Sequence, residues 1–247
     1  MSIQTPEELM RLREAGRVVR ETLAAMRRQA REGVTTAELD NAGIEVMRRN
    51  GARSAPAMVY GFPGASCISV NEEAVHGIPS KRTLRGGDLL KLDVTIEKDG
   101  FMADAAVTVP IGKVSPRKQE LAQCAKRAFD EAILVARAGV RVSEIGRVVE
   151  REVRRSGFSV MRELAGHGIG RSIHEAPSIP NYADPEADEI LTEGLVITIE
   201  PIIAAGNGRS VLEQDGWTIR TADRQPSAHY EHTIVITQGQ PILLTAA

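Results

Sequence analysis

The sequence has few cysteines and lacks any long apolar run. Cys67 and Cys124 are its only cysteines, and they lie far apart without CxxC spacing, so we expect free thiols in a reducing compartment. No stretch approaches the length of a transmembrane helix, and the charges of Glu7, Glu8 and Arg11 stand where a signal peptide would need an apolar segment. We therefore expect a cytoplasmic protein that is neither exported nor inserted in a membrane.

An excess of charge of one sign is also lacking. Lys and Arg total 31, Asp and Glu total 33, and the formal net charge is -2, which leaves no electrostatic footprint for nucleic acid or an anionic membrane. The sequence does have length and apolar content, with 247 residues of which 42% are hydrophobic. That is enough to bury the core of one large domain or of two closely packed halves.

Part of the sequence is duplicated. Residues 30–51 align without gaps on residues 136–157, an offset of 106 residues, and 8 of the 22 pairs are identical. In each copy a charged segment with helical periodicity reaches a Gly-Val break, and a second amphipathic helix then ends at a glycine. The first helices are expected at 6–31 and 116–137, and strands at 89–97, 101–109, 195–200 and 231–237.

This pattern predicts an α+β fold in a single domain over residues 1–247. The domain would consist of two halves, about 5–113 and 114–245, related by a pseudo-twofold axis. We expect the sheet inside and the helices outside, so that side chains from both halves converge on one central site.

Two carboxylates fall on one face of a predicted hairpin. Asp93 alternates with apolar neighbours, and Asp99-Gly100 supplies a two-residue turn. With that turn, Thr95 pairs with Asp104, and Asp93 becomes the diagonal neighbour of Asp104 at about 7 Å or less between Cβ atoms. Such a pair can share a metal ion, although solvated polar positions on a one-sided sheet would give the same pattern.

A histidine and two further carboxylates adjoin core-like strands. His167 lies between glycines that let the backbone approach closely, and these glycines do not complete a GxGxxG motif because Arg171 replaces the third glycine. Glu200 ends one apolar run and Glu231 opens another. Buried carboxylates are costly unless they bind a cation, and an oxygen-rich set with one imidazole suits Mn(II), Fe(II) or Co(II) at least as well as Zn(II).

Six short motifs occur in order between His76 and Thr233, within a match that runs from Pro6 nearly to the C-terminus. Together they resemble type I methionine aminopeptidases of peptidase family M24A, including the 11 residues from Asp93 to Asp104 and the 7 from His167 to His174. The motifs are His76-Gly77-Ile78-Pro79, Leu92-Asp93-Val94-Thr95, Gly166-His167-Gly168-Ile169-Gly170, His174-Glu175-x-Pro177, Thr198-Ile199-Glu200-Pro201 and Tyr230-Glu231-His232-Thr233.

The resemblance implies the pita-bread fold, with two pseudo-twofold-related halves around a central curved antiparallel sheet. It also implies two divalent metal ions per chain, whether Fe²⁺, Mn²⁺, Co²⁺ or Zn²⁺, and five ligands. Asp104 and Glu231 would bridge both ions, Asp93 would complete one coordination shell, and His167 and Glu200 would complete the other. We expect the short bacterial form of the enzyme.

Roles in catalysis are implied in the same way. His76 would hydrogen-bond the scissile amide, His174 would stabilise the developing oxyanion, and Glu200 would shuttle a proton. His229 and His232 match no motif, and we interpret both as structural.

The resemblance places a pocket for the methionine side chain beside the metal site. Phe62, Cys67 and Trp217 would line it, with Ile173 and Val59 where the family more often has aromatic residues. Ala105 also departs from the family, which commonly has threonine there.

The implied function is metal-dependent removal of the initiator methionine from nascent proteins and peptides when the second residue is small. Alternatives are an Xaa-Pro peptidase of the same fold and a non-catalytic pita-bread binding protein, which would be expected to have lost metal ligands. Partners would be nascent N-termini and, because the first helix is rich in arginine, the ribosome near its exit tunnel. Interspersed Glu14 and Glu21 favour a solvated helix face instead, and we expect a monomer.

Overall fold

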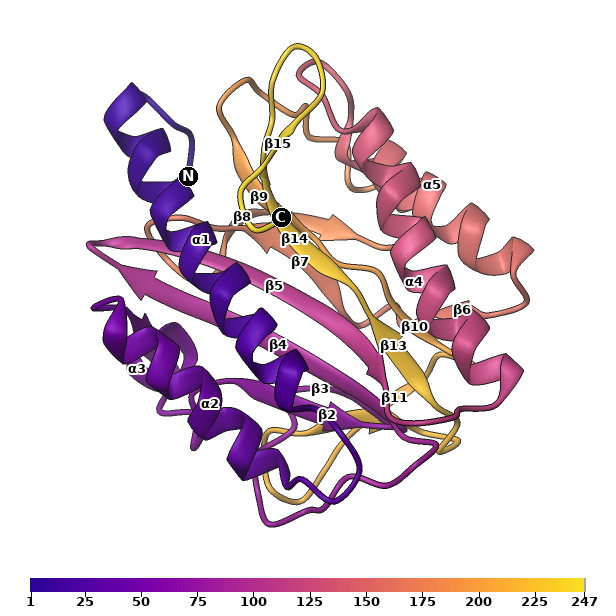
Figure 1. The fold of residues 1–247 in the computed structure, drawn as a ribbon. Helices are drawn as coiled ribbons and strands as arrows, with labels where there is room; N and C mark the ends of the chain where they lie inside the picture. The colour runs from indigo at the N-terminus through magenta and orange to yellow at the C-terminus, as the bar shows by residue number, and fades with distance from the viewer. Residues whose placement is uncertain (247) are drawn as a thin grey trace.

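The computed structural model describes residues 1–246, in which long helices pack beside a large antiparallel sheet (Figure 1). Figure 1 shows one helix pair from each half of the chain, α1 with α2 and α4 with α5, flanking the central strands β5 and β14. Within residues 1–246 no helix is both long enough and apolar enough to cross a membrane. The helices are α1 (Pro6–Gln29), α2 (Thr36–Arg49), α3 (Ala55–Tyr60), α4 (Pro116–Val135) and α5 (Val142–Arg155).

The helix ends follow from local sequence. Thr5 caps α1 and Ser115 caps α4, each through its side-chain oxygen and each followed by a proline in the first turn, which is a favoured helix start. The aligned segments fold alike, because α2 and α5 both have 14 residues and each is followed by a glycine in the left-handed region, Gly51 at φ 61° and Gly157 at φ 75°. Placing the boundary between the two halves at residues 113/114 stays a prediction.

The main sheet joins strands from both halves of the chain. Its order is β1-β4-β5-β14-β9-β7-β8, with β2 also paired to β4 and β15 to β14. Two smaller sheets have the orders β13-β10-β6 and β11-β12-β3. The strands are β1 (Arg53–Ser54), β2 (Cys67–Val70), β3 (Glu73–Val75), β4 (Leu89–Lys98), β5 (Phe101–Pro110), β6 (Ser159–Val160), β7 (Ala165–Gly168), β8 (Glu175–Pro180), β9 (Val196–Ile199), β10 (Ile202–Ala204), β11 (Ser210–Leu212), β12 (Ile219–Thr221), β13 (Ser227–His229), β14 (Glu231–Val235) and β15 (Ile242–Leu243).

The predicted hairpin register is confirmed. Thr95 pairs with Asp104, and Lys98 pairs with Phe101 across the turn. Asp99 and Gly100 both have positive φ, 50° and 82°, as the two central residues of a type I′ turn require. The structure therefore places Asp93 and Asp104 on the same face of the hairpin.

Side-chain alternation separates the hydrophobic core from the site. Leu92, Val94 and Ile96 pack in one cluster with Val18 and Val19 of α1. A second large cluster consists of Leu89 and buried hydrophobic residues drawn from between Leu121 and Ile236. Because successive strand residues point to opposite faces, the residues between those core positions on β4 face away from α1, into a cavity at the other side of the sheet.

Candidate metal centre

The four predicted carboxylates converge on one cavity, as the resemblance implied. Asp93 of β4, Asp104 of β5, Glu200 after β9 and Glu231 of β14 all line it. The strands that carry the last three are neighbours in the sheet, because β14 pairs with β5 on one side and with β9 on the other. Both halves of the chain therefore supply acidic groups to the same site.

His167 reaches the cavity from β7, which also pairs with β9. Its backbone N–H donates to Thr198 Oγ1 at 3.0 Å. A Cβ at Gly166 would lie 2.6 Å from Thr198 O, and one at Gly168 would overlap the Ala176 carbonyl. The glycines on either side of the histidine are thus required for the close approach of β7 to its neighbours.

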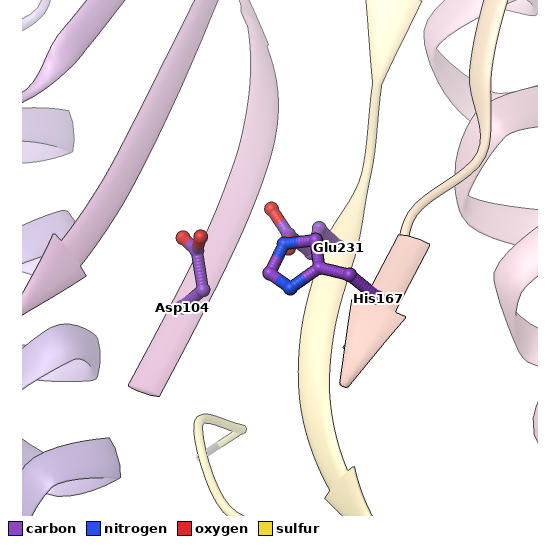
Figure 2. A group of neighbouring side chains, drawn as sticks. All are labelled: Asp104, His167 and Glu231. Atoms are coloured by element: carbon purple, nitrogen blue, oxygen red, sulfur yellow. The ribbon is translucent and has the colours of Figure 1, made fainter. Parts of the chain in front are cut away.

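One compact group of side chains has the composition of a metal site. Figure 2 shows Asp104, His167 and Glu231 pointing toward one another from three strands, and one ligand atom from each lies within 4.8 Å of the others. The buried oxygens Asp104 Oδ1 and Glu231 Oε1 have no hydrogen-bond partner among the described residues. Buried oxygens of this kind are costly unless something binds them, and a divalent cation fits this donor set.

Hydrogen bonds orient the carboxylates without neutralising them. Thr95 Oγ1 donates to Asp104 Oδ2 at 2.7 Å, and Thr198 Oγ1 donates to Glu200 Oε1 at 2.8 Å. Asp104 and Glu231 are only 6% and 2% exposed. Within residues 1–246 no lysine or arginine forms an ion pair with these four carboxylates. Their only basic neighbours within 4 Å are His167 and His229, which carry a charge only when protonated.

Burial sets the protonation of the metal-free site. It raises the pKa of Asp104 to about 6, and it raises the pKa values of Asp93, Glu200 and Glu231 well above their usual range, with further upward contributions from neighbouring carboxylates. Burial also lowers the pKa of His167 to about 4. Near pH 7 the imidazole is therefore neutral and can bind a metal, while the carboxylates compete for protons.

These shifts predict proton-linked metal binding. A cation must displace protons from the carboxylates, so its affinity is expected to rise with pH and to fall as the pH drops through about 6. Calorimetric titration of the metal-free protein with Mn(II) in buffers of different ionisation enthalpy measures the released protons. An affinity that is the same at pH 5.5 and pH 8, with no proton release, would contradict the assignment.

The predicted methionine pocket adjoins the carboxylates in the same cavity of about 240 Å³. Phe62, Cys67, Ile173 and Trp217 line it, and the rings of Phe62 and Trp217 meet edge to face at 5.2 Å between centroids. Burial raises the pKa of the Cys67 thiol, so the sulfur is neutral. These walls suit an unbranched apolar side chain.

The expectation that Val59 borders this pocket is wrong. Val59 is 45% exposed and does not line the cavity, whereas its neighbour Tyr60 does. Both residues lie in the last turn of α3 and are about equally exposed, at 45% and 47%, so only their place relative to the cavity distinguishes them. An aromatic ring is therefore present at the cavity, one residue later than the resemblance suggested.

His76 and His174 also line the cavity, as expected. His76 has φ 57°, a backbone conformation that is uncommon for a non-glycine residue and is often found at functional sites. The His174 ring lies 4.2 Å from that of His167 between centroids, and His174 Nδ1 is 2.7 Å from the Tyr60 hydroxyl oxygen. The Tyr60 contact was not predicted from the sequence.

The two remaining histidines behave differently from each other. The His232 ring does not line the cavity and contacts Thr245 Oγ1 at 2.8 Å and the Tyr230 hydroxyl at 3.3 Å, and its structural interpretation stays a prediction. His229, which we also interpreted as structural from the sequence, lines the cavity beside Glu200 and Glu231. His229 precedes Glu231 by two residues, and the period of two along an extended chain could have indicated a shared face.

Comparisons with known proteins identify the family of the chain. The sequence profile of metallopeptidase family M24 matches residues 10–238. Methionine aminopeptidase 2 of Bacillus subtilis is 44% identical over 247 residues, covering 99% of each chain. A methionine aminopeptidase of Staphylococcus epidermidis is 39% identical, covering 99% of this chain and 98% of its own.

Solved structures give the same result for the fold. The crystal structure of a methionine aminopeptidase from Thermotoga maritima superposes with a TM-score of 0.97 at 35% identity, covering 100% of both chains. A prolidase from Pyrococcus furiosus reaches a TM-score of 0.80 at 23% identity, covering 99% of this chain but 65% of its own. The second likeness shows the fold alone.

Proposed function

Because the chain belongs to metallopeptidase family M24 and, within it, to the methionine aminopeptidases, we propose that it removes the N-terminal methionine of proteins and peptides whose second residue is small. The observation that carries this proposal is the buried group of Asp104, His167 and Glu231 beside an apolar pocket. The substrates would be nascent polypeptide N-termini.

The proposed centre holds two divalent ions through Asp93, Asp104, His167, Glu200 and Glu231. Asp104 and Glu231 would be shared between the ions, which agrees with the unpartnered oxygen that each of them presents. When bound, such ions supply Lewis acidity, polarising a peptide carbonyl and lowering the pKa of water. Fe²⁺, Mn²⁺, Co²⁺ and Zn²⁺ all suit the mixed oxygen and nitrogen donors.

The remaining residues would manage protons and position the substrate. Glu200 is buried, and its raised pKa suits a carboxylate that accepts and returns a proton. Partial burial lowers the pKa of His174, so its ring is neutral near pH 7. If the Tyr60 hydroxyl donates to Nδ1, the ring proton lies on Nε2, where it can stabilise a developing oxyanion. His76 would donate to the scissile amide.

Reconstitution tests this proposal directly. Protein stripped of metal and reloaded with Co(II), Mn(II), Fe(II) or Zn(II) is expected to release methionine from a Met-Ala-Ser peptide, whereas the stripped protein does not. Absence of turnover with each of the four metals would contradict the proposal.

The pocket predicts the order of substrates. Apolar discrimination is worth only about 1–3 kcal/mol per methylene, so Leu-Ala should be cleaved measurably but less well than Met-Ala. Lys-Ala should be rejected, because the walls would leave a buried ammonium unpaired. The measurement is kcat/KM for Met-Ala, Leu-Ala, Lys-Ala and Xaa-Pro peptides. A preference for Xaa-Pro would favour the proline-directed alternative, and no cleavage of any peptide would favour a binding protein.

Cellular context is part of the same proposal. Two buried free thiols, Cys67 and Cys124, fit a reducing compartment, and we assign the protein to the cytoplasm. Arg17 of α1 pairs with Glu14 at 3.0 Å and with Glu21 at 2.6 Å. Because these neighbours partly neutralise the helix face, it offers little net charge to a ribosome, and we propose that this face of α1 is exposed to solvent. We also propose that the enzyme is a monomer.

A further inference from the structure

His229 is a buried polar side chain with unsatisfied hydrogen-bonding capacity. It is 1% exposed, and neither Nδ1 nor Nε2 has a hydrogen-bond partner among residues 1–246. Nε2 lies 3.5 Å from Glu231 Oε2 and 3.9 Å from Glu200 Oε2. An imidazole left in this state is unfavourable, so its position beside two carboxylates calls for a bound group.

The spacing of these atoms fits a shared cation better than direct hydrogen bonds. N–H···O bonds in proteins usually span about 2.7–3.2 Å, and both distances exceed that range. Ligands held by a metal at about 2.1 Å are separated by about 3.0 Å at right angles and about 4.2 Å when opposite. Distances of 3.5 Å and 3.9 Å fall between these limits.

Glu200 lies between two imidazoles. Its Oε1 is 3.6 Å from His167 Nε2, and its Oε2 is 3.9 Å from His229 Nε2. Among residues 1–246, two groups of side chains could hold a cation, Asp104-His167-Glu231 and Glu200-His229-Glu231, and they share Glu231. This arrangement supplies one imidazole on each side of the acidic cluster.

We propose that His229 is a further metal ligand, which with Glu200 and Glu231 binds one of the two divalent ions through Nε2. Two divalent ions balance the four carboxylates, and a third would leave an excess of positive charge near buried Lys91, which acts electrostatically on His229. His229 therefore belongs to one of the two proposed ions. The inference rests on the proposed metal-dependent function, but it concerns binding, which is measured without turnover.

The test compares Co(II) binding to metal-free wild-type protein with binding to His229→Gln and His229→Ala. Glutamine keeps an amide that can donate a hydrogen bond but is a far weaker metal ligand. Both variants are expected to bind one of the two Co(II) ions about 100-fold more weakly or worse, beyond the 10–100-fold that is typical when a residue only supports a ligand. The visible d–d absorption of the bound Co(II) should change as well. The matched control is His232→Gln, three residues along and hydrogen-bonded away from the cavity, which should leave both readouts unchanged.

A measurement on the unaltered protein keeps the proposal testable if the variants do not fold. Co(II) shifts the ring N–H signals of its histidine ligands far outside the normal proton range, and two such signals are expected, from His167 and His229. A single shifted signal would overturn the proposal, as would full Co(II) affinity and an unchanged spectrum in His229→Gln. Loss of peptidase activity by itself, with two shifted signals present, would count against the proposed function and leave the ligand assignment supported.

Discussion

Replacing Asp104 by asparagine is expected to lower kcat/KM for a Met-Ala peptide by more than about 100-fold and to weaken binding of at least one divalent ion. Mutations that only support a ligand typically cost 10–100-fold, and Asp104 is proposed to touch both ions. Its Oδ1 faces the site without a partner, and its Oδ2 accepts from Thr95. An asparagine would remove one of four charges and could turn an N–H group toward the cation. Glu231→Gln, which alters the other shared carboxylate, should behave in the same way.

Loss of the fold would not explain that result. In the metal-free protein burial raises the pKa of Asp104 to about 6 from its ordinary 3.8, so ionisation of this group opposes folding at pH 7, and the penalty fades as the pH falls from about 6 to about 4. Metal-free Asp104→Asn should therefore resist urea at pH 7 at least as well as the unaltered protein. Peptidase activity and metal content close to those of the unaltered enzyme would refute the shared-ligand role.

The same hairpin offers a control. Asp99 lies at its turn, is paired with Lys98 at 3.2 Å and is exposed. Its φ of 50° is one that asparagine adopts readily. Asp99→Asn is thus the same chemical change on the same two strands but outside the cavity, and it should leave turnover and metal content unaffected.

Residues linked by short-range rules were predictable from the sequence. The register of β4 and β5 depends on the two-residue turn at Asp99-Gly100 and on strand alternation, so the placement of Asp93 relative to Asp104 could be worked out before any coordinates were known. The duplicated helices α2 and α5 were visible because the same break and terminal glycine recur. In both cases the controlling residues lie within a few positions of the feature that they determine.

Contacts between segments that are distant in the sequence were harder to predict from it. The resemblance supplied the convergence of His167 and Glu200 with the hairpin, since nothing local dictates which strands become neighbours. Tyr60 was missed because the rotation of the short helix α3 decides whether Val59 or Tyr60 faces the cavity. Neither side chain is charged, so polarity does not indicate which of the two faces it. The place of His229 was missed because it matches no motif and because the predicted strand began at Glu231, whereas the structure has His229 at the end of the preceding strand β13.

Replacing His174 by alanine is expected to lower kcat by about 100-fold or more while metal content stays unchanged, since removing one oxyanion donor typically costs about 10²–10³. His174 contacts Tyr60 and packs against the His167 ring, but it is not among the clustered groups able to hold a cation. KM should change less than kcat, because the lost interaction forms mainly in the transition state. A fall in metal stoichiometry would instead mean that His174 is itself a ligand.

Tyr60→Phe tests whether catalysis depends on the hydrogen bond that orients the His174 ring, with the ring itself kept in place. The phenyl ring keeps the packing against His174 at 5.8 Å between centroids but removes the hydroxyl that contacts Nδ1 at 2.7 Å. One hydrogen bond is worth about 0.5–1.5 kcal/mol, so kcat should fall about two- to tenfold, well short of the His174→Ala effect. The loss should vanish when Tyr60→Phe is combined with His174→Ala, because the hydroxyl is proposed to act only through that ring. Tyr182→Phe, which removes a hydroxyl bonded to Asp184 outside the cavity, should leave kcat unchanged. If Tyr60→Phe slowed the His174→Ala enzyme by the same factor, Tyr60 would have to contact the substrate directly.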